Sequence, residues 1–302
     1  MNYLIYAFNF LLLLFWIRLW SAPDREFYFN PFLSGTVKLT DSVLSFLRPV
    51  LYLPEQAAAF VVILFFILFK TILFFRLNMA LPIPIGTYFQ FAPPMAAGPK
   101  IASLLLFNVL NTAVFFLRLW SAYLLVRLIT PPFRTTRATE ALAFFARPIS
   151  KLPFLAQPVI LFGLHIVIAF VLSRTGLFVF LDQTTEATNA GAVSPFTEGP
   201  VYAQLLKTVW LAALSFADGL MFLTRALFVL ILTSLGAAIL QAHGLQIICS
   251  EGVELLLGRF ARRGGNGMGF DFTPLIFFFV IDLMYGSICR ILFELIQSPF
   301  LK

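Results

Sequence analysis

The chain has 302 residues, of which 60% are hydrophobic and 12% are charged, and its mean hydropathy is +0.93. This composition excludes an ordinary soluble globular domain and is typical of a protein embedded in a lipid bilayer. The formal net charge of +7 does not indicate a nucleic-acid-binding protein, because the Lys and Arg residues fall in alternate loops and do not gather on one soluble face.

Long apolar windows follow one another along the chain. A transmembrane helix needs about 20 apolar residues to cross about 30 Å of hydrocarbon. We therefore predict an all-α integral membrane protein with about six transmembrane helices. The fifth window exceeds one crossing and contains Asp218-Gly219, so the sequence leaves open whether it forms one helix or two. The six windows are residues 2–22, 56–77, 100–129, 154–174, 208–241 and 272–296.

The charges of the loops predict the topology. Basic residues are concentrated in loops 23–55, 130–153 and 242–271. Loop 78–99 has no Lys or Arg, and loop 175–207 has one Lys against three acidic residues. By the positive-inside rule, the three basic loops are cytoplasmic and both termini lie on the outer side of the membrane.

A heptapeptide near the start of the chain recurs further along. Residues 16–22 and residues 116–122 share the run Arg-Leu-Trp-Ser-Ala, and Arg-Pro and Gly-Pro dipeptides recur at nearly the same spacing. Each repeat holds an even number of crossings, so the repeats point the same way across the membrane. We predict three parallel two-helix repeats, at residues 1–78, 79–175 and 176–302, of which the third is degenerate and begins with an outer loop, 176–207.

Each predicted repeat has an amphipathic segment between its two spans. In the first, apolar residues recur at helical spacing, and similar patterns occur near residues 138–145 and 253–260. We expect interfacial helices, the first two ended by Pro49 and Pro148. Basic residues in these loops are candidates for binding anionic lipid or a partner protein, with simple interfacial anchoring as the alternative. These residues are Arg48, Arg147, Arg259, Arg262 and Arg263. The apolar face of the first helix consists of Leu39, Val43, Phe46, Leu47 and Val50.

Four short motifs carry a family resemblance. They are the run Phe27-Tyr28-Phe29-Asn30-Pro31-Phe32, the pairs Arg48-Pro49 and Leu53-Pro54, and the run Phe270-Asp271-Phe272-Thr273-Pro274. Together they resemble the YggT family of small integral membrane proteins, which are built from two copies of such a unit. The resemblance implies a non-catalytic role in membrane organisation or assembly, in a bacterial inner (cytoplasmic) membrane. Bacterial relatives are linked to cell division and osmotic tolerance, and chloroplast relatives to cofactor attachment on a cytochrome.

Two of these motifs also have a purely structural interpretation. Asn30, before Pro31 and Phe32, and Asp271, shortly before Pro274, are suited to cap the start of a helix, because a short polar side chain accepts free amide protons there. Ligand binding is the alternative for both residues.

The sequence offers few groups for catalysis. His165 lies within the fourth span and His243 follows the fifth, so they lie at different depths and form a poor haem-ligand pair. Cys249 and Cys289 lack metal-type spacing. We therefore expect no enzyme activity, no catalytic or metal-binding residues and no cofactor.

Charged residues inside spans form the last candidate site. Asp282 lies well inside the sixth window, and Arg225 in the fifth window is its most plausible partner. A structural ion pair is one interpretation of Arg225 and Asp282, and a pathway for a small ion or solute is the other.

Three functions therefore stay open. The first is a membrane scaffold or assembly factor that contacts membrane lipids and other integral membrane proteins but no nucleic acid. The second is an accessory subunit of a larger respiratory or photosynthetic complex, which would cover part of the apolar surface made by 38 Phe residues. The third is a small ion or solute transporter that uses Asp282 and Arg225.

Overall fold

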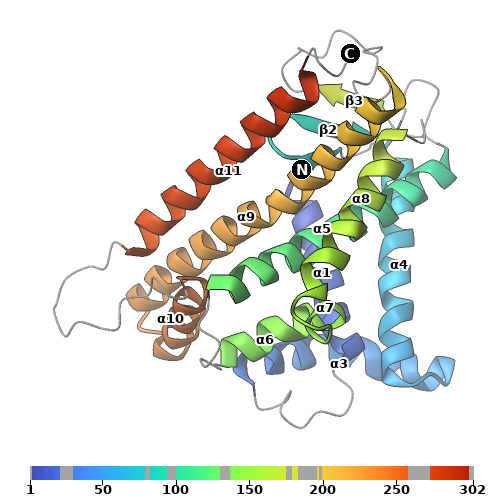
Figure 1. Ribbon diagram of the computed structural model, residues 1–302. Coiled ribbons are helices and arrows are strands. Elements are labelled where there is room, and N and C mark those ends of the chain that lie inside the picture. The colour runs from blue at the N-terminus through green and yellow to red at the C-terminus, as the bar shows by residue number, and fades with distance from the viewer. Residues whose placement is uncertain are drawn as a thin grey trace. The chain divides into compact units, whose positions relative to one another are not determined.

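The chain is mostly helical (Figure 1) and has five helices in its described part that are long and apolar enough to cross a membrane. They overlap the second to sixth predicted windows, so the prediction of several helices long and apolar enough to cross a membrane is confirmed. These helices are α4 (Glu55–Arg76), α5 (Ile101–Ile129), α8 (Ala156–Arg174), α9 (Val201–Ile239) and α11 (Thr273–Gln297). The computed structural model describes residues 2–20, 30–78, 82–93, 100–129, 137–174, 179–182, 196, 199–257 and 273–298.

Helices α1 and α9 correspond to the first and fifth windows. Helix α1 (Asn2–Trp20) includes the apolar segment Ala7–Trp20, which is shorter than the five spans, so the sixth crossing stays a prediction. Helix α9 is one continuous helix of 39 residues that runs through Asp218-Gly219. Its length of about 58 Å exceeds the hydrocarbon thickness, so it must tilt or extend beyond the hydrocarbon.

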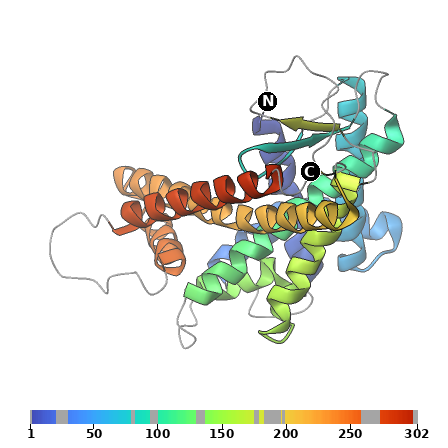
Figure 2. The ribbon, with the colours of Figure 1, turned by 45° about the horizontal axis from the view of Figure 1, so that its top comes forward.

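A small antiparallel sheet corrects the all-α prediction. Strands β1 (Ile83–Ile85), β2 (Phe89–Ala92) and β3 (Val179–Asp182) pair in the order β1-β2-β3, and Figure 2 shows β2 and β3 side by side. They come from the two loops that lack a basic excess. Ile83 and Ile85 are buried whereas Pro84 is exposed. This period-two pattern marks a strand, but it is too short to stand out between long apolar windows.

The chain forms two compact units, and α4, α5, α9 and α11 contribute residues to both. This division differs from the three predicted sequence repeats, which stay a prediction. The first unit comprises residues 1–66, 122–153 and 220–282. The second unit comprises residues 67–121, 154–219 and 283–302.

Amphipathic helices form much of the first unit. They are α3 (Pro31–Leu51), α6 (Arg137–Phe145) and α10 (His243–Leu257), and a short helix, α7 (Arg147–Ser150), follows α6. Helix α6 contacts both α3 and α10, and α1 contacts α3 and α6. Each of the three segments of the first unit thus supplies one amphipathic helix, as the sequence predicted for each repeat.

Helix α3 has three distinct faces. The predicted apolar face points away from the protein, and a different set of residues packs into the first unit, because successive residues on a helix turn by about 100°. A helix with a core-facing side, an apolar outer side and a polar outer side is suited to a membrane–water interface. The core-facing residues are Leu33, Val37, Thr40 and Leu44. The apolar outer residues are Leu39, Val43, Phe46 and Val50. The polar outer residues are Lys38, Asp41, Ser42, Ser45 and Arg48.

The end of α3 differs from the prediction. Pro49 lies inside the helix, which continues to Leu51. Tyr52 then adopts a left-handed conformation (φ 52°), and the Leu53 amide donates to the Arg48 carbonyl at 3.3 Å. This is a Schellman-type ending. The left-handed residue Tyr52 and the hydrogen bond from Leu53 therefore terminate the helix. Pro49 lies in the last turn but does not end it.

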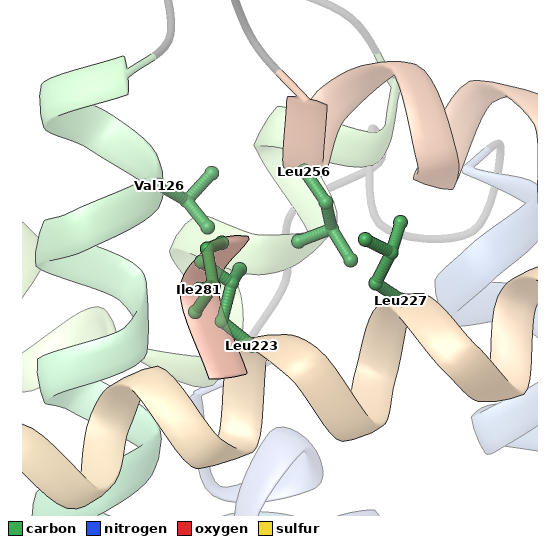
Figure 3. Packing of buried hydrophobic residues seen from close by; sticks show 5 residues of the cluster. All are labelled: Val126, Leu223, Leu227, Leu256 and Ile281. Atoms are coloured by element: carbon green, nitrogen blue, oxygen red, sulfur yellow. The ribbon is translucent and has the colours of Figure 1, made fainter. Parts of the chain in front are cut away.

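A cluster of buried aliphatic residues joins four helices of the first unit (Figure 3). The cluster consists of Leu223 and Leu227 of α9, Ile281 of α11, Val126 of α5 and Leu256 of α10. The rings of Phe228 and Phe278 also lie with their centroids 5.8 Å apart. Residues 223–228 of α9 and residues 278–281 of α11 therefore lie beside one another.

Candidate functional site

A buried ion pair lies in the second unit. Arg118 Nη2 lies 2.5 Å from Asp218 Oδ2, and the two side chains are 9% and 1% exposed. Arg118 belongs to the second copy of the repeated Arg-Leu-Trp-Ser-Ala run, on α5, and Asp218 lies on α9. Neither residue was among the predicted site residues, although a charged residue inside a span needs a partner.

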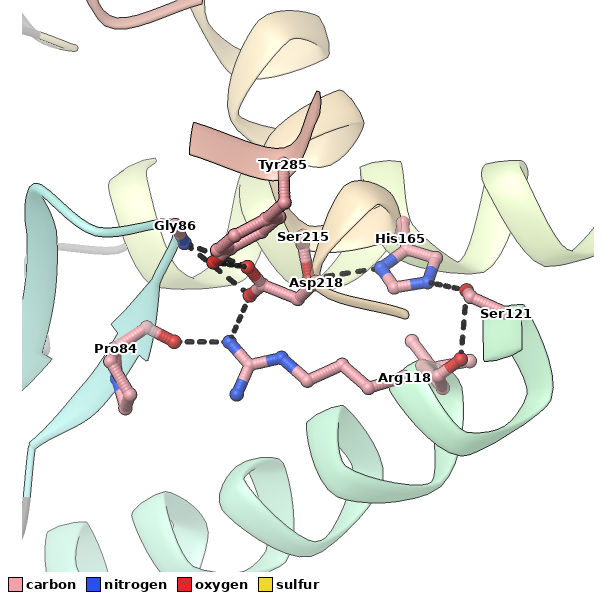
Figure 4. Close-up of polar contacts among 9 residues, drawn as sticks. Pro84, Gly86, Arg118, Ser121, His165, Ser215, Asp218 and Tyr285 are labelled. Atoms are coloured by element: carbon pink, nitrogen blue, oxygen red, sulfur yellow. Dashed lines mark hydrogen bonds and ion pairs between the residues drawn. The ribbon is translucent and has the colours of Figure 1, made fainter. Parts of the chain in front are cut away.

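Backbone and tyrosine donors complete the surroundings of Asp218 (Figure 4). The Gly86 amide donates to its Oδ1 at 3.1 Å, and the Tyr285 hydroxyl donates to the same oxygen at 2.8 Å. Arg118 also donates to the Pro84 carbonyl. Charge-assisted hydrogen bonds of this kind are stronger than neutral ones. The β1–β2 hairpin is therefore joined to α5, α9 and α11 through one carboxylate.

The hairpin also packs through aromatic rings onto the C-terminal part of α11. The ring centroids of Tyr88 and Phe293 lie 4.4 Å apart in a stacked arrangement, and those of Phe89 and Phe293 lie 5.4 Å apart. Phe196 is fully buried, with its ring centroid 5.7 Å from that of Phe89. These contacts hold the turn of the hairpin against the carboxylate.

Gly86 is suited to this turn for two reasons. Its φ of +63° is a left-handed conformation that side chains disfavour. A Cβ atom there would lie 3.2 Å from Leu214 Cδ2 and 3.6 Å from Cys289 Sγ. A side chain would therefore push the turn away from α9 and α11.

We expect Gly86→Ala to destabilise the protein by about 1–2 kcal/mol, because it strains the turn and weakens the amide hydrogen bond to Asp218. The measurement is unfolding in mixed detergent and SDS micelles. Gly163→Ala is the matched control, since nothing lies within 4 Å of a Cβ at this helical position of the same unit. There, alanine should be neutral or stabilising. Equal effects of both changes would contradict the role of the turn.

A histidine bridges two serines beside the ion pair. His165 Nε2 lies 3.1 Å from Ser121 Oγ, and His165 Nδ1 lies 2.9 Å from Ser215 Oγ. Ser121 donates to the Leu117 carbonyl at 3.0 Å. A neutral imidazole that donates from Nε2 and accepts at Nδ1 satisfies this chain of bonds. Both ring nitrogens of His165 are therefore occupied by protein groups.

The predicted pair of Arg225 and Asp282 does not form within the chain. Both side chains lie in the first unit and are exposed, and the ion pairs among the described residues do not join them. The physical reason is that α9 and α11 turn Leu223 and Ile281 into a shared apolar cluster, which leaves Arg225 and Asp282 on other sides of their helices. The buried ion pair Arg118–Asp218 instead joins two spans, α5 and α9.

The predicted lipid- or partner-binding arginines have different surroundings. Arg48 is half exposed, with Nη1 3.7 Å from Glu55 Oε2. Arg147 donates to the Trp20 carbonyl at 2.6 Å, and its guanidinium carbon lies 4.8 Å from the centre of the Phe144 ring. A cation at the last carbonyl of α1 complements the helix dipole. The other predicted arginines, Arg259, Arg262 and Arg263, lie outside the described residues.

The motif residues lie at helix starts where the structure describes them. Asn30 directly precedes α3, which begins at Pro31, and its carbonyl accepts the Leu33 amide at 3.0 Å. Phe32 is the second residue of the same helix. Pro274 occupies the first turn of α11, a favoured place for proline. Asp271 lies outside the described residues, and side-chain capping by Asn30 stays a prediction.

The first copy of the repeated run carries a second buried arginine. Arg18 of α1 is 3% exposed, and its Nη2 lies 2.5 Å from Asp41 Oδ1 and 2.8 Å from Glu55 Oε1. The indole of Trp16 donates to the Phe145 carbonyl at 3.1 Å. Both copies of the run therefore place an arginine at a junction of several helices. The repeated run is the sequence signal that these two arginines share, but the sequence analysis did not use it to predict them as site residues.

Comparisons with known proteins add no assignment. The chain matches no protein-family model, no curated protein and no solved structure at a significant level. The likeness to the YggT family therefore rests on the short motifs alone. Among the described residues, no group of three or more His, Cys, Asp or Glu side chains is placed to hold a metal ion, and Cys249 and Cys289 are both free thiols.

Proposed function

We propose that the chain is a non-catalytic scaffold or assembly factor of a bacterial inner membrane, with both termini on the outer side. The observation that carries this proposal is that Asp218 is fully buried and directs its bonds to groups of its own unit. Such a network braces helices against one another. A unit braced in this way, with apolar outer faces, supports a role in which the surfaces, and not an internal site, contact other membrane components.

The hydrogen bonds of His165 to two serines also support a structural role. Ser121 lies at a distance from His165 at which a hydrolase would activate a nucleophile. However, the other imidazole nitrogen meets the hydroxyl of Ser215, where such enzymes place a group that orients the base, usually a carboxylate. All three side chains are almost fully buried. This arrangement favours a hydrogen-bonded brace between α5, α8 and α9.

An accessory subunit of a larger respiratory or photosynthetic complex is the first alternative. The support for it is the unequal burial of the spans. Half of the apolar window of α5 is buried within the chain, but only 22% of that of α9 and 17% of that of α11. Lipid covers such surfaces readily, and so would a larger membrane complex. The partners under either proposal are membrane lipids and other integral membrane proteins.

A small ion or solute transporter is the second alternative, and it now depends on different residues. An ionisable group inside a span is by default a candidate for function. Arg118, Asp218 and His165 form such a group of side chains, whereas the exposed Arg225 and Asp282 do not converge. A transporter would need Asp218 to change partners during its cycle.

Purification of the wild-type chain and of the Arg118→Met/Asp218→Leu variant from the native membrane in mild detergent tests these proposals. Mass spectrometry and an absorption spectrum would identify what accompanies each chain. We expect a fixed set of partner proteins that the folded variant retains, because a brace is replaceable by apolar packing. Tyr285→Phe, which removes one donor to Asp218, is the control for a mild change. A lone wild-type chain, together with a transport activity that the folded variant loses, would contradict the scaffold.

A further inference from the structure

Asp282 occupies an unfavourable position on the surface of a span. It lies nine residues beyond Thr273, the first residue of α11, and fifteen residues before Gln297, the last. These separations correspond to about 14 Å and about 22 Å along the helix axis. The exposed side chain is therefore well inside the hydrocarbon when α11 crosses the bilayer.

The described part of the chain does not neutralise this carboxylate. Within the described residues, Asp282 takes part in no hydrogen bond or ion pair. Lys and Arg side chains extend far enough to reach the membrane surface, but the single methylene of Asp does not. An ionisable group in hydrocarbon is unfavourable unless it is paired. The carboxylate therefore requires a cationic or hydrogen-bonding group from another molecule.

Asp282 belongs to a stripe of exposed residues along α11. Four residues of the helix follow one another at separations of four, three and four, which places them on one helix face. They are Leu275, Phe279, Asp282 and Gly286. The same alternation of three and four residues lines the contact between two helices that pack along their length. The stripe therefore has the pattern of a helix–helix contact, but the described residues of this chain leave it exposed.

Gly286 leaves space for such a helix one turn beyond Asp282. A Cβ atom at this position would have no other described residue within 4 Å, so packing inside the described chain does not require a glycine here. Glycine also lowers the helix propensity of a span interior. In membranes, small residues let the backbones of two helices approach closely. Gly286 is therefore suited to contact with a helix from outside the chain.

The charge of Asp282 indicates which kind of helix fits the stripe. A two-fold axis along the membrane normal would bring the stripes of two copies together with both Asp282 carboxylates at one depth, and like charges disfavour such a contact. We infer that the stripe binds a transmembrane helix of a different protein, which carries a Lys or Arg side chain at the depth of Asp282. Such a side chain neutralises the carboxylate within the hydrocarbon. The inference rests on the scaffold proposal, because it names the chemistry of a scaffold partner.

Two synthetic helices test this inference. Each is a Leu-rich transmembrane peptide of about 20 residues, with either Arg or Leu at its midpoint. The full-length chain carries a donor dye at its N-terminus and each peptide carries an acceptor dye, so that energy transfer in phosphatidylcholine vesicles gives the dissociation constant. We expect this constant to be at least about tenfold lower for the Arg peptide than for the Leu peptide.

Neutral variants assign this difference to Asp282. Asp282→Asn should bring the two dissociation constants to within about threefold of each other. Glu294→Gln is the matched control and should keep the difference, because Glu294 is also exposed on α11 but lies near its end, 3.0 Å from Arg290 Nε. Gly286→Leu should raise the dissociation constants of both peptides at least about threefold, since it prevents close approach. Only variants that elute as one symmetric peak are compared.

Three results would overturn the inference. The first is a wild-type chain that binds the two peptides equally or binds neither. The second is a folded Asp282→Asn chain that keeps the full preference for the Arg peptide. The third is energy transfer between two labelled copies of the chain that Gly286→Leu abolishes, which would mean that a second copy covers the stripe. Partner proteins that co-purify with the Asp282→Asn/Gly286→Leu chain would still support the scaffold proposal, so the two failures are distinguishable.

Discussion

Replacing Asp218 by Leu should destabilise the folded protein by about 3–5 kcal/mol, because it leaves the buried Arg118 guanidinium without its counter-charge. The amide of Gly86 and the hydroxyl of Tyr285 lose their acceptor at the same time. Arg118→Met should destabilise somewhat less, since the Asp218 carboxylate keeps those two donors. Unfolding in mixed detergent and SDS micelles measures both changes.

The double variant separates the ion pair from the rest of the network. Arg118→Met/Asp218→Leu should be more stable than Asp218→Leu alone, because no uncompensated buried charge remains. Tyr285→Phe should destabilise by about 1.5–3 kcal/mol, the contribution of one hydrogen bond to a charged group. Additive effects of the two charge removals would show that Arg118 and Asp218 do not interact in the folded protein in these micelles.

The long helices were predictable because their signal is strong. About 20 apolar residues in a row specify a span with little competition from other structures, and five of the six windows became helices of sufficient length. The amphipathic helices α3, α6 and α10 were also predictable from their three- and four-residue spacing. Strands β1 and β2 were not, because three- and four-residue strands are stabilised by contacts with Phe196 and Phe293 that are distant in sequence.

The ion pair was harder to predict than the helices. Asp218 and Gly219 together suggested a break in the fifth window, because both residues disfavour a helix interior. The bonds that Asp218 makes to Arg118 and Gly86 offset that preference, and these partners lie far away in the sequence. Asp282 was predicted as a site residue because it lies deep in a span. The depth of a residue along a helix does not show whether its side chain faces the rest of the protein.

Loss of one carboxylate should destabilise the protein less at the first copy of the repeated run than at the second. Arg18 pairs with both Asp41 and Glu55, which are 53% and 29% exposed. Asp41→Asn or Glu55→Gln alone should therefore destabilise the protein by about 1 kcal/mol or less. Together they remove both carboxylates from a guanidinium that is 3% exposed, and we expect a loss of about 3 kcal/mol or more.

The comparison with Arg48 makes this prediction specific. Arg48 is half exposed and lies 3.7 Å from the same Glu55, so Arg48→Gln should change the stability by about 0.5 kcal/mol or less. The carboxyl variants and this control are compared by unfolding in the same micelles. If the effects of Asp41→Asn and Glu55→Gln simply add, the two carboxylates do not substitute for one another. Arg18 would then hold α1, α3 and α4 together through packing of its aliphatic stem, and the two arginines of the repeat would not share a common electrostatic role.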